Sequence, residues 1–147
     1  MERKIQKTFV DEGFGFKITL LNVPIVKVRG VWTPDVNYNE LSKVVLLALC
    51  EKPARLTGNE VKFIRQHFEM TLQDFAKRFC VTHPGVLKWE KNKNRPTGMN
   101  WATEKDIRLF VLAKLRPLGL AELYSGLEKE APSKSEPLKV DASDMAA

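Results

Sequence analysis

The side chains with the clearest chemical use lie in a short basic loop, residues 91–95, which reads KNKNR. Its cations Lys91, Lys93 and Arg95, together with the amide of Asn94, suit contacts to phosphate groups. Such contacts position a protein on nucleic acid without reading its sequence. The alternative is a solvated loop that only faces water. The residue types favour the first interpretation and predict a polyanionic partner.

Two further side chains precede this basic loop and can read base edges. The imidazole of His83 can donate or accept a hydrogen bond, and Lys88, one helical turn later, can reach a guanine or a phosphate. The alternative for His83 is exposure to solvent after a helix cap. Together with the basic loop, these residues are chemically suited to contacts with a nucleic acid.

Charge is concentrated around these residues. The chain has 147 residues and a formal net charge of +6. Residues 55–116 hold 13 Lys and Arg against 6 Asp and Glu, which is +7, whereas residues 1–54 carry +2 and residues 117–147 carry −3. A basic segment of this kind is typical of a nucleic-acid-binding surface.

Enzyme, metal and membrane sites are not expected. Cys50 and Cys80 belong to no Cys-x-x-Cys or Cys/His cluster, so we expect both to be core residues in a reducing compartment. The two histidines, His67 and His83, have no catalytic arrangement around them, and no cofactor is indicated. The sequence has no signal peptide, and the apolar run 44–49 is too short to cross a bilayer, so a cytoplasmic protein without a membrane partner is expected.

Two short helices are needed to hold the DNA-contacting side chains. The sequence predicts one helix at Thr71–Phe79 and a second at His83–Lys91, with Thr82 as N-cap and Pro84 in the first turn, where a missing N–H costs little. A three-residue link joins them, as in a helix-turn-helix unit. In that unit the second helix presents its N-terminal side chains to the major groove.

The first helix and the link supply the supporting contacts. Ala76 is small where the two helices must approach closely, and Val81 and Val86 fill the joint between them. Gln73 and Lys77 lie on the first helix and are further candidates for phosphate contacts.

The N-terminal zone, residues 1–54, opens with strand patterns. Residues 14–21 alternate apolar and polar side chains, and residues 23–32 are rich in Val and Ile, so both are predicted strands. Asn22–Pro24 is the expected connection between them. Residues 33–37 have the composition of a loop.

The rest of the chain is predicted to be mainly helical. A helix is expected at 39–52. Residues 55–129 are expected to form several consecutive helices, with a capping box at Thr57–Glu60 and a long helix starting at Thr103. Residues 130–147 are expected to be a disordered tail. The predicted fold class is α+β, mainly α, with a small N-terminal β-hairpin and helix unit followed by a five-helix domain.

The sequence TLQDFAKRFCVTHPGVLKWEKNKNRP resembles the lambda-repressor-like (XRE) helix-turn-helix family, over about residues 56–112. The matching positions are Thr71, Ala76, Val81, Thr82, Val86, Trp89, Glu90 and Pro96. The resemblance implies that His83, Pro84 and Gly85 face the base edges. Pro84 and Gly85 offer no side-chain hydrogen bond, so they would read thymine methyl groups or DNA shape, or permit close approach.

The resemblance has further structural implications. It implies an ion pair between Arg65 and Glu90. Leu72 stands where the family often has a DNA-contacting glutamine. Cys80 and Asn92 stand at two positions where the family has glycine, so each is expected to adopt or tolerate a left-handed backbone.

The complete set of predicted DNA-contacting residues is Gln73, Lys77, Thr82, His83, Pro84, Gly85, Lys88, Lys91, Lys93, Asn94 and Arg95.

The stretch NVPIVKVRGVWTPDVNYNELSKVVLLALCEK, followed by LTGNEV, is similar to MqsA-type antitoxin regulators, although their zinc-binding cysteines are absent. The resemblances imply a sequence-specific transcriptional regulator that acts as antitoxin and autorepressor of a toxin–antitoxin pair. Its expected partners are operator DNA, a second copy in a homodimer and a cognate toxin bound by the N-terminal zone or the tail.

The alternative function is a protein-interaction adaptor that retains the helix-turn-helix fold without binding DNA. Leu72, Pro84 and Gly85 favour this alternative because they remove polar readers. The basic loop and the +7 segment argue against it.

The long helix from Thr103 is apolar on more than one face, which leaves surface for a second subunit.

Overall fold

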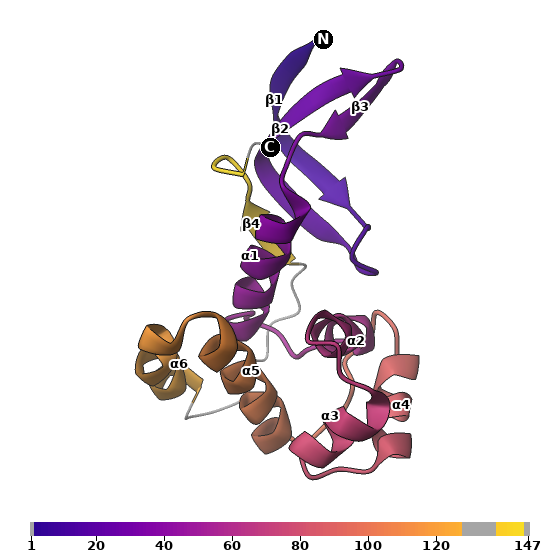
Figure 1. Cartoon of the computed structure of the whole chain (residues 1–147), viewed down its shortest axis with the longest axis vertical. Coiled ribbons are helices and arrows are strands. Elements are labelled where there is room, and N and C mark those ends of the chain that lie inside the picture. The colour runs from indigo at the N-terminus through magenta and orange to yellow at the C-terminus, as the bar shows by residue number, and fades with distance from the viewer. Residues whose placement is uncertain (1, 128–137, 146–147) are drawn as a thin grey trace. The chain divides into compact units, whose positions relative to one another are not determined.

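The computed structural model describes residues 2–127 and 138–145 and has an α+β fold, with six α-helices and a small sheet among these residues (Figure 1). It divides into two compact units, residues 1–48 with 137–147 and residues 49–136. The sequence-based division at residues 54 and 55 is near this boundary, but it did not include the return of C-terminal residues to the first unit.

The elements follow the chain in a simple order. The first unit holds β1 (Arg3–Asp11), β2 (Ile18–Val28), β3 (Val31–Pro34), the start of α1 (Tyr38–Cys50), and β4 (Leu138–Asp141). The second unit holds α2 (Gly58–His67), α3 (Leu72–Arg78), α4 (His83–Lys91), α5 (Trp101–Leu115), a 3-10 helix (Pro117–Gly119) and α6 (Leu120–Leu127).

β2 is the central strand of the sheet. β1 pairs with it in antiparallel orientation along one edge. On the other edge β2 pairs with two strands, in parallel with β4 over Ile18–Leu21 and antiparallel with β3 over Ile25–Val28. One long strand therefore organises the whole sheet.

Asn22 changes which side chains of β2 are buried. The buried residues are Ile18 and Leu20 before it and Val23 and Ile25 after it. Asn22 has φ 53°, a left-handed conformation that asparagine tolerates, and pairing with β1 continues on both sides of it. The prediction of two strands joined at Asn22–Pro24 is therefore wrong, because one strand continues through this position with its alternation reversed.

Two other features of the sheet were not anticipated. β1 has no clear alternation because most of its side chains are exposed, including Ile5 and Val10. β3 includes Thr33 and Pro34, which were predicted to be loop, and these residues pair with Val26 and Ile25. β1 and the last two residues of β3 were missed in the sequence analysis for the same reason. The pairing of an edge strand depends on the neighbouring strand as much as on its own sequence.

The predicted disordered tail is wrong for residues 138–145. Leu138 and Val140 of β4 are buried, and β4 pairs with the first residues of β2. The Asn22 amide donates to the Asp141 carboxylate at 3.3 Å, and the Asn37 N–H donates to the Met145 carbonyl at 3.0 Å. This short strand depends on a partner more than a hundred residues away. Residues 130–137 and 146–147 of the predicted tail lie outside the described residues.

The helices of the second unit begin at capping residues. The capping box of α2 is present as predicted, with Thr57 and Glu60 each bonding to the other's backbone N–H. The helix predicted to start at Thr103 instead starts at Trp101, because the Asn100 side chain accepts from the Ala102 N–H at 2.8 Å. These caps satisfy N–H groups that have no partner inside the helix.

The core of the second unit combines aliphatic side chains with an aromatic cluster. Fully buried members are Val61, Ile64, Phe75, Val86, Ile107 and Val111. Phe110 of α5 lies against Phe68 and Phe79, with ring centroids 5.4 Å apart in both pairs. Edge-to-face contacts of this kind add specific geometry to apolar burial.

A buried charge network, formed by Lys52, Arg55, Glu60, Glu104 and Arg108, fixes the segment before α2. The Arg108 guanidinium donates to the carbonyls of Lys52 and Ala54 at 2.7 and 2.6 Å and to the Glu104 carboxylate at 2.9 Å. The side chains of Arg108 and Glu104 are almost completely buried. Arg108 therefore supplies hydrogen bonds to the backbone carbonyls of a segment, Lys52–Ala54, that has no regular secondary structure.

The other members of the network complete its hydrogen bonding. Glu104 also accepts from the Arg55 side chain at 2.9 Å and from the Leu56 N–H at 3.1 Å. Lys52 and Glu60 form a second buried pair at 2.7 Å. Each carboxylate thus has a cationic partner, which is the condition for burying it at tolerable cost.

Candidate nucleic-acid interface

Two threonine caps define the helices that carry the predicted contact residues. Thr71 accepts from the Asp74 N–H at 3.0 Å, and the Asp74 carboxylate accepts from the Thr71 N–H at 3.2 Å. Thr82 accepts from the Gly85 N–H at 3.1 Å, and Pro84 lies in the first turn of α4. These caps confirm the predicted starts of both helices.

The turn between α3 and α4 depends on Cys80. This residue has φ 57°, a left-handed conformation that glycine adopts most readily. The following Val81 N–H donates to the Ala76 carbonyl at 2.9 Å and closes the turn. A non-glycine residue here is strained by about 1–2 kcal/mol.

The two cysteines differ in exposure. Cys50 is buried, and burial raises the pKa of its thiol to about 12. Cys80 is exposed, so the prediction that both are core residues is wrong for Cys80. Its place in a tight left-handed turn directs its side chain outward.

The implied ion pair between Arg65 and Glu90 is present. The Arg65 guanidinium donates to both oxygens of the Glu90 carboxylate, at 2.7 and 3.0 Å, and also to the Met70 carbonyl at 2.9 Å. The Glu90 side chain is 7% exposed. This bidentate contact joins α2 to α4 and to the residue before the cap of α3, so it fixes the orientation of α4.

α4 buries one face and exposes the other. Val86 and Glu90 are buried. What we call the exposed face of α4 consists of His83, Pro84, Leu87, Lys88 and Lys91. These positions are spaced by three and four residues, so they form one continuous strip on the helix.

Leu87 was missed in the sequence analysis. It lies on the exposed face of α4 and is 37% exposed. The signal that could have identified it was present in the sequence, because Leu87 follows His83 by four residues and Pro84 by three. Its apolar character does not by itself distinguish it from a core residue such as the buried Val86 beside it.

The basic loop after α4 is held by a network of hydrogen bonds. The Asn92 side chain donates to the Pro96 and Thr97 carbonyls at 2.9 and 3.2 Å. The first N–H groups of α2 donate to this loop, Gly58 to the Arg95 carbonyl at 3.2 Å and Asn59 to the Lys93 carbonyl at 2.9 Å. The loop backbone is therefore ordered before any ligand binds.

The left-handed residue of this loop is Lys93, not Asn92. Lys93 has φ 54°, whereas Asn92 is the C-cap of α4 with a right-handed φ of −71°. The expectation for Asn92 was one residue early, because the left-handed position follows the C-cap. An exposed lysine thus occupies a position that favours glycine.

Gly58 allows α2 to approach the end of α4. A Cβ atom at this position would overlap the Trp89 carbonyl oxygen and lie 2.9 Å from the Lys93 nitrogen. Both neighbours are backbone atoms, so they cannot move aside as a flexible side chain could. No short-range sequence pattern indicated this close approach.

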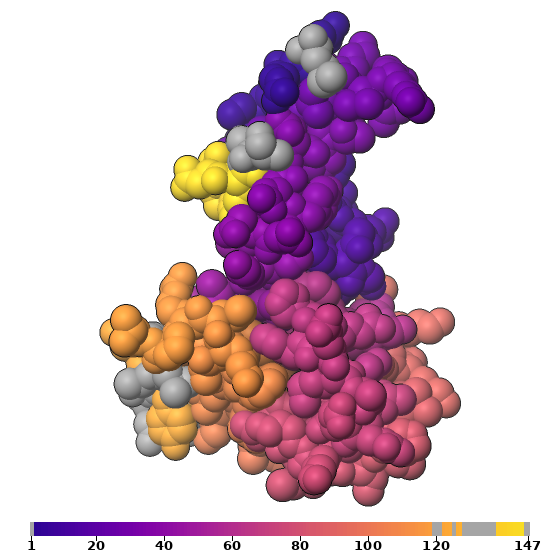
Figure 2. All heavy atoms as spheres, in the orientation of Figure 1, coloured from indigo at the N-terminus to yellow at the C-terminus, as the bar shows by residue number. Residues whose placement is uncertain are grey.

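The predicted contact residues are accessible. Ten of the eleven are exposed and Gly85 is half-buried. Figure 2 shows the magenta and pink atoms of α3, α4 and the basic loop at the surface of the second unit. Lys77 lies on α3, which packs against α4, and the remaining cations lie on α4 and the loop that follows it. The structure thus gathers the predicted residues on two adjacent helices and one loop.

Among the described residues, the cations of this surface have no acidic partners. In the described part of the chain, no ion pair involves Lys77, Lys88, Lys91, Lys93 or Arg95. Residues 71–95 contain only two acidic residues, Asp74 and Glu90. Asp74 accepts the Thr71 N–H and Glu90 is paired with Arg65. The surface therefore retains a net positive field.

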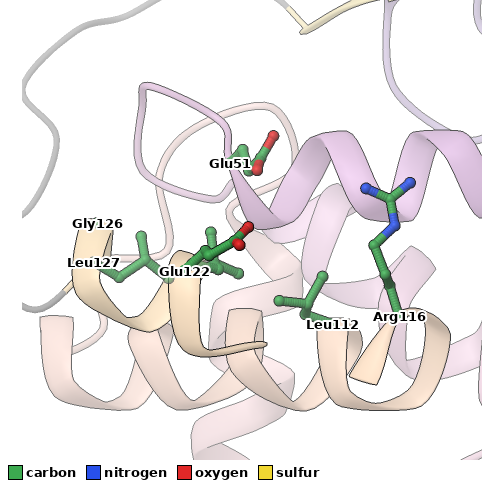
Figure 3. A pocket seen from close by; sticks show the side chains of 7 residues that line it. Glu51, Leu112, Arg116, Glu122, Gly126 and Leu127 are labelled. Atoms are coloured by element: carbon green, nitrogen blue, oxygen red, sulfur yellow. The ribbon is translucent and has the colours of Figure 1, made fainter. Parts of the chain in front are cut away.

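A pocket of about 390 Å³ lies elsewhere in the second unit, beside α5 and α6 (Figure 3). Leu112, Leu123 and Leu127 supply apolar walls, and Glu51 and Glu122 contribute carboxylates. None of the eleven predicted contact residues lines it. We therefore treat it as separate from the candidate interface.

Comparison with protein-family models, with curated proteins and with solved structures finds no match. In residues 2–127 and 138–145, no group of three or more His, Cys, Asp or Glu side chains is placed to hold a metal ion. No helix within those residues combines the length and the apolar character that crossing a bilayer requires.

Proposed function

We propose that this protein is a sequence-specific DNA-binding protein in which α3 and α4 form a lambda-repressor-like helix-turn-helix. The observation that supports this most directly is the exposed face of α4, continuous with a hydrogen-bonded basic loop whose cations form no ion pair with any described residue. Arg55, Arg65, Arg78 and Arg108 of the same unit, by contrast, each pair with a carboxylate. Cations that the chain leaves exposed and unpaired suit an external polyanion.

The geometry suggests a division of roles within the interface. His83 and Lys88 lie on the exposed face of α4 and would contact base edges in the major groove. Lys77 on α3 and the cations of the basic loop would contact phosphates on either side. Because the loop is already ordered, binding would cost little conformational entropy there.

A homodimer is part of this proposal. One nine-residue helix reads few bases, and symmetric dimers place two such helices about 34–36 Å apart, one turn of DNA. A groove of about 370 Å³ beside α5 and α6 offers surface for a second subunit. Its lining combines Leu109, Phe110, Ala113 and Tyr124 with the charged residues Arg78, Asp106 and Lys114.

We further propose that the protein acts as an antitoxin and represses its own operon. This part rests on the sequence resemblance of residues 22–52 to MqsA-type regulators. Co-purification of the full chain with the product of an adjacent small reading frame would support it. Repeated failure to co-purify would favour a regulator that acts without a toxin.

A second candidate function is a protein-interaction adaptor. The half-buried Leu72 and the exposed Leu87 favour it, because both place apolar side chains on or near the presumed DNA surface. Salt dependence separates the two functions, since a DNA-binding protein loses affinity steeply as salt increases.

The test is a mobility-shift titration of the full chain on the DNA upstream of its own gene. We expect the double variant His83→Ala, Lys88→Ala to lose specific binding while its circular dichroism spectrum is unchanged. Lys62→Ala is the matched control, because Lys62 is exposed on α2 outside the predicted contact set. Unchanged specific binding by the double variant would overturn the proposed recognition surface.

A further inference from the structure

Leu87 is an apolar residue in an otherwise polar and basic surface. Among the described residues 71–95, it is the one large apolar side chain that is exposed. The preceding residue, Val86, is completely buried, whereas Leu87 is 37% exposed. The exposed part of Leu87 is therefore available for an external contact.

The neighbours of Leu87 define what that contact can be. Pro84 lies one turn before it and Lys91 one turn after it, and Lys88 is adjacent on the same face. Pro84 and Leu87 together make a small apolar strip bordered by groups that bind DNA. In the major groove, the apolar group presented by a base is the 5-methyl group of thymine.

A second copy of this chain is a poorer occupant for the same strip. A symmetric contact through Leu87 would bring Lys88 and Lys91 of one subunit close to the same lysines of the other. None of these lysines has an acidic partner in the described residues, so the contact would be repulsive. DNA phosphates would instead neutralise both.

We infer that Leu87, supported by Pro84, recognises the 5-methyl group of a thymine in each half-site of the DNA target. The inference rests on the proposed function and adds a specificity-determining residue to it. It also explains how a helix with few polar readers can select a sequence: His83 and Lys88 supply hydrogen bonds, and Leu87 supplies discrimination through apolar contact. The target would therefore contain thymine at a position that no hydrogen-bonding side chain of α4 needs to read.

The test compares thymine with uracil, which lacks only the methyl group. A random 20-base-pair duplex library is selected with the full-length protein, and the best binder is resynthesised with each thymine replaced in turn by uracil. We expect one replacement per half-site to weaken binding about fourfold, the effect of removing one buried methyl group. In Leu87→Ala the same replacement should change affinity by less than a factor of about 1.5, whereas Leu118→Ala, a change at a 98% exposed leucine, should retain the fourfold ratio.

The outcomes separate this inference from the proposed function. If selection yields a specific sequence whose binding is insensitive to every uracil replacement, the role of Leu87 is wrong and DNA binding stands. If a uracil effect persists unchanged in Leu87→Ala, another residue contacts the methyl group and the inference fails. If selection yields no specific sequence, both the inference and the proposed function fail. A change in oligomeric state of Leu87→Ala without a change in the thymine-to-uracil ratio would assign Leu87 to a subunit contact.

Discussion

Two regions of the second unit use the same types of charged residue in opposite ways. In the buried charge network, Arg108 and Glu104 are 1% and 0% exposed, and each has several hydrogen-bond partners. On the exposed face of α4 and in the basic loop, the cations are exposed and have no acidic partner in the described residues. In the first region the charged groups are paired with one another inside the fold. In the second region the cations remain available to bind an external anion.

The difference has a simple electrostatic basis. A buried charge without a partner costs several kcal/mol, so interior cations must be paired by the chain itself. An exposed cation costs little to leave unpaired, and its phosphate contacts release counterions from DNA. Substitutions in the buried charge network should therefore change stability, whereas substitutions in the basic loop should change binding. Four predictions test this separation, in order of decreasing expected effect.

The largest effect is expected from Arg108→Met, which removes one cation of the buried charge network at nearly constant volume. Glu104 would keep only Arg55 as a cationic partner, and the carbonyls of Lys52 and Ala54 would lose their donor. We expect a loss of about 3–5 kcal/mol in the free energy of unfolding, measured by urea denaturation. The double variant Glu104→Gln, Arg108→Met should lose less than Arg108→Met alone. A loss below about 1 kcal/mol in the single variant would contradict the importance of the network.

The next effect is expected from Gly58→Ala, which tests how the two regions are connected. The added methyl group would overlap backbone atoms at the end of α4 and must displace the basic loop or the start of α2. We expect a loss of about 1–3 kcal/mol in stability and weaker DNA binding by the folded protein. Gly126→Ala is the matched control, because a Cβ there meets no atom within 4 Å. Equal stabilities of the two variants would show that the close approach is not tight.

The sequence predicted those parts of this arrangement that depend on local interactions. The caps at Thr57, Thr71 and Thr82 bond to groups within three residues, so a short pattern was enough to predict them. The Arg65 to Glu90 pair was anticipated only through resemblance to a family. Accessibility of the contact residues followed from helix periodicity, which separates the exposed face of α4 from Val86 and Glu90.

The parts that were missed depend on distant chain segments. β4 is a strand because β2 offers it an edge, and Gly58 is constrained because α4 passes beside it. The bonds of Arg108 to Lys52 and Ala54 cross more than fifty residues. Leu87 was missed for a different reason, since an apolar residue on a helix is assumed to face the core until the buried face is known.

The third prediction concerns the basic loop and the triple variant Lys91→Ala, Lys93→Ala, Arg95→Ala. These side chains are exposed and unpaired in the described residues, so stability should change by less than about 0.5 kcal/mol. The slope of log Kd against log salt should fall by about 2.7, because each lost phosphate contact removes about 0.9. Affinity should fall for all DNA sequences alike, as measured by fluorescence anisotropy. An altered sequence preference with an unchanged slope would assign these residues to base contacts instead.

The smallest effect is expected at Lys93, where backbone strain and a useful exposed charge occur in the same residue. Lys93 is left-handed with φ 54°, so glycine should relieve strain and raise stability by about 0.5 kcal/mol while removing one phosphate contact. Lys93→Ala should lose the same contact without the gain in stability. Cys80→Gly should give the gain without the loss, because Cys80 shares the left-handed conformation but is not a predicted contact residue. If Lys93→Gly instead bound DNA as well as the original protein, lysine at this strained position would have no role in binding. If all three behave as expected, the chain tolerates local strain at residue 93 in order to keep a cation at the DNA surface.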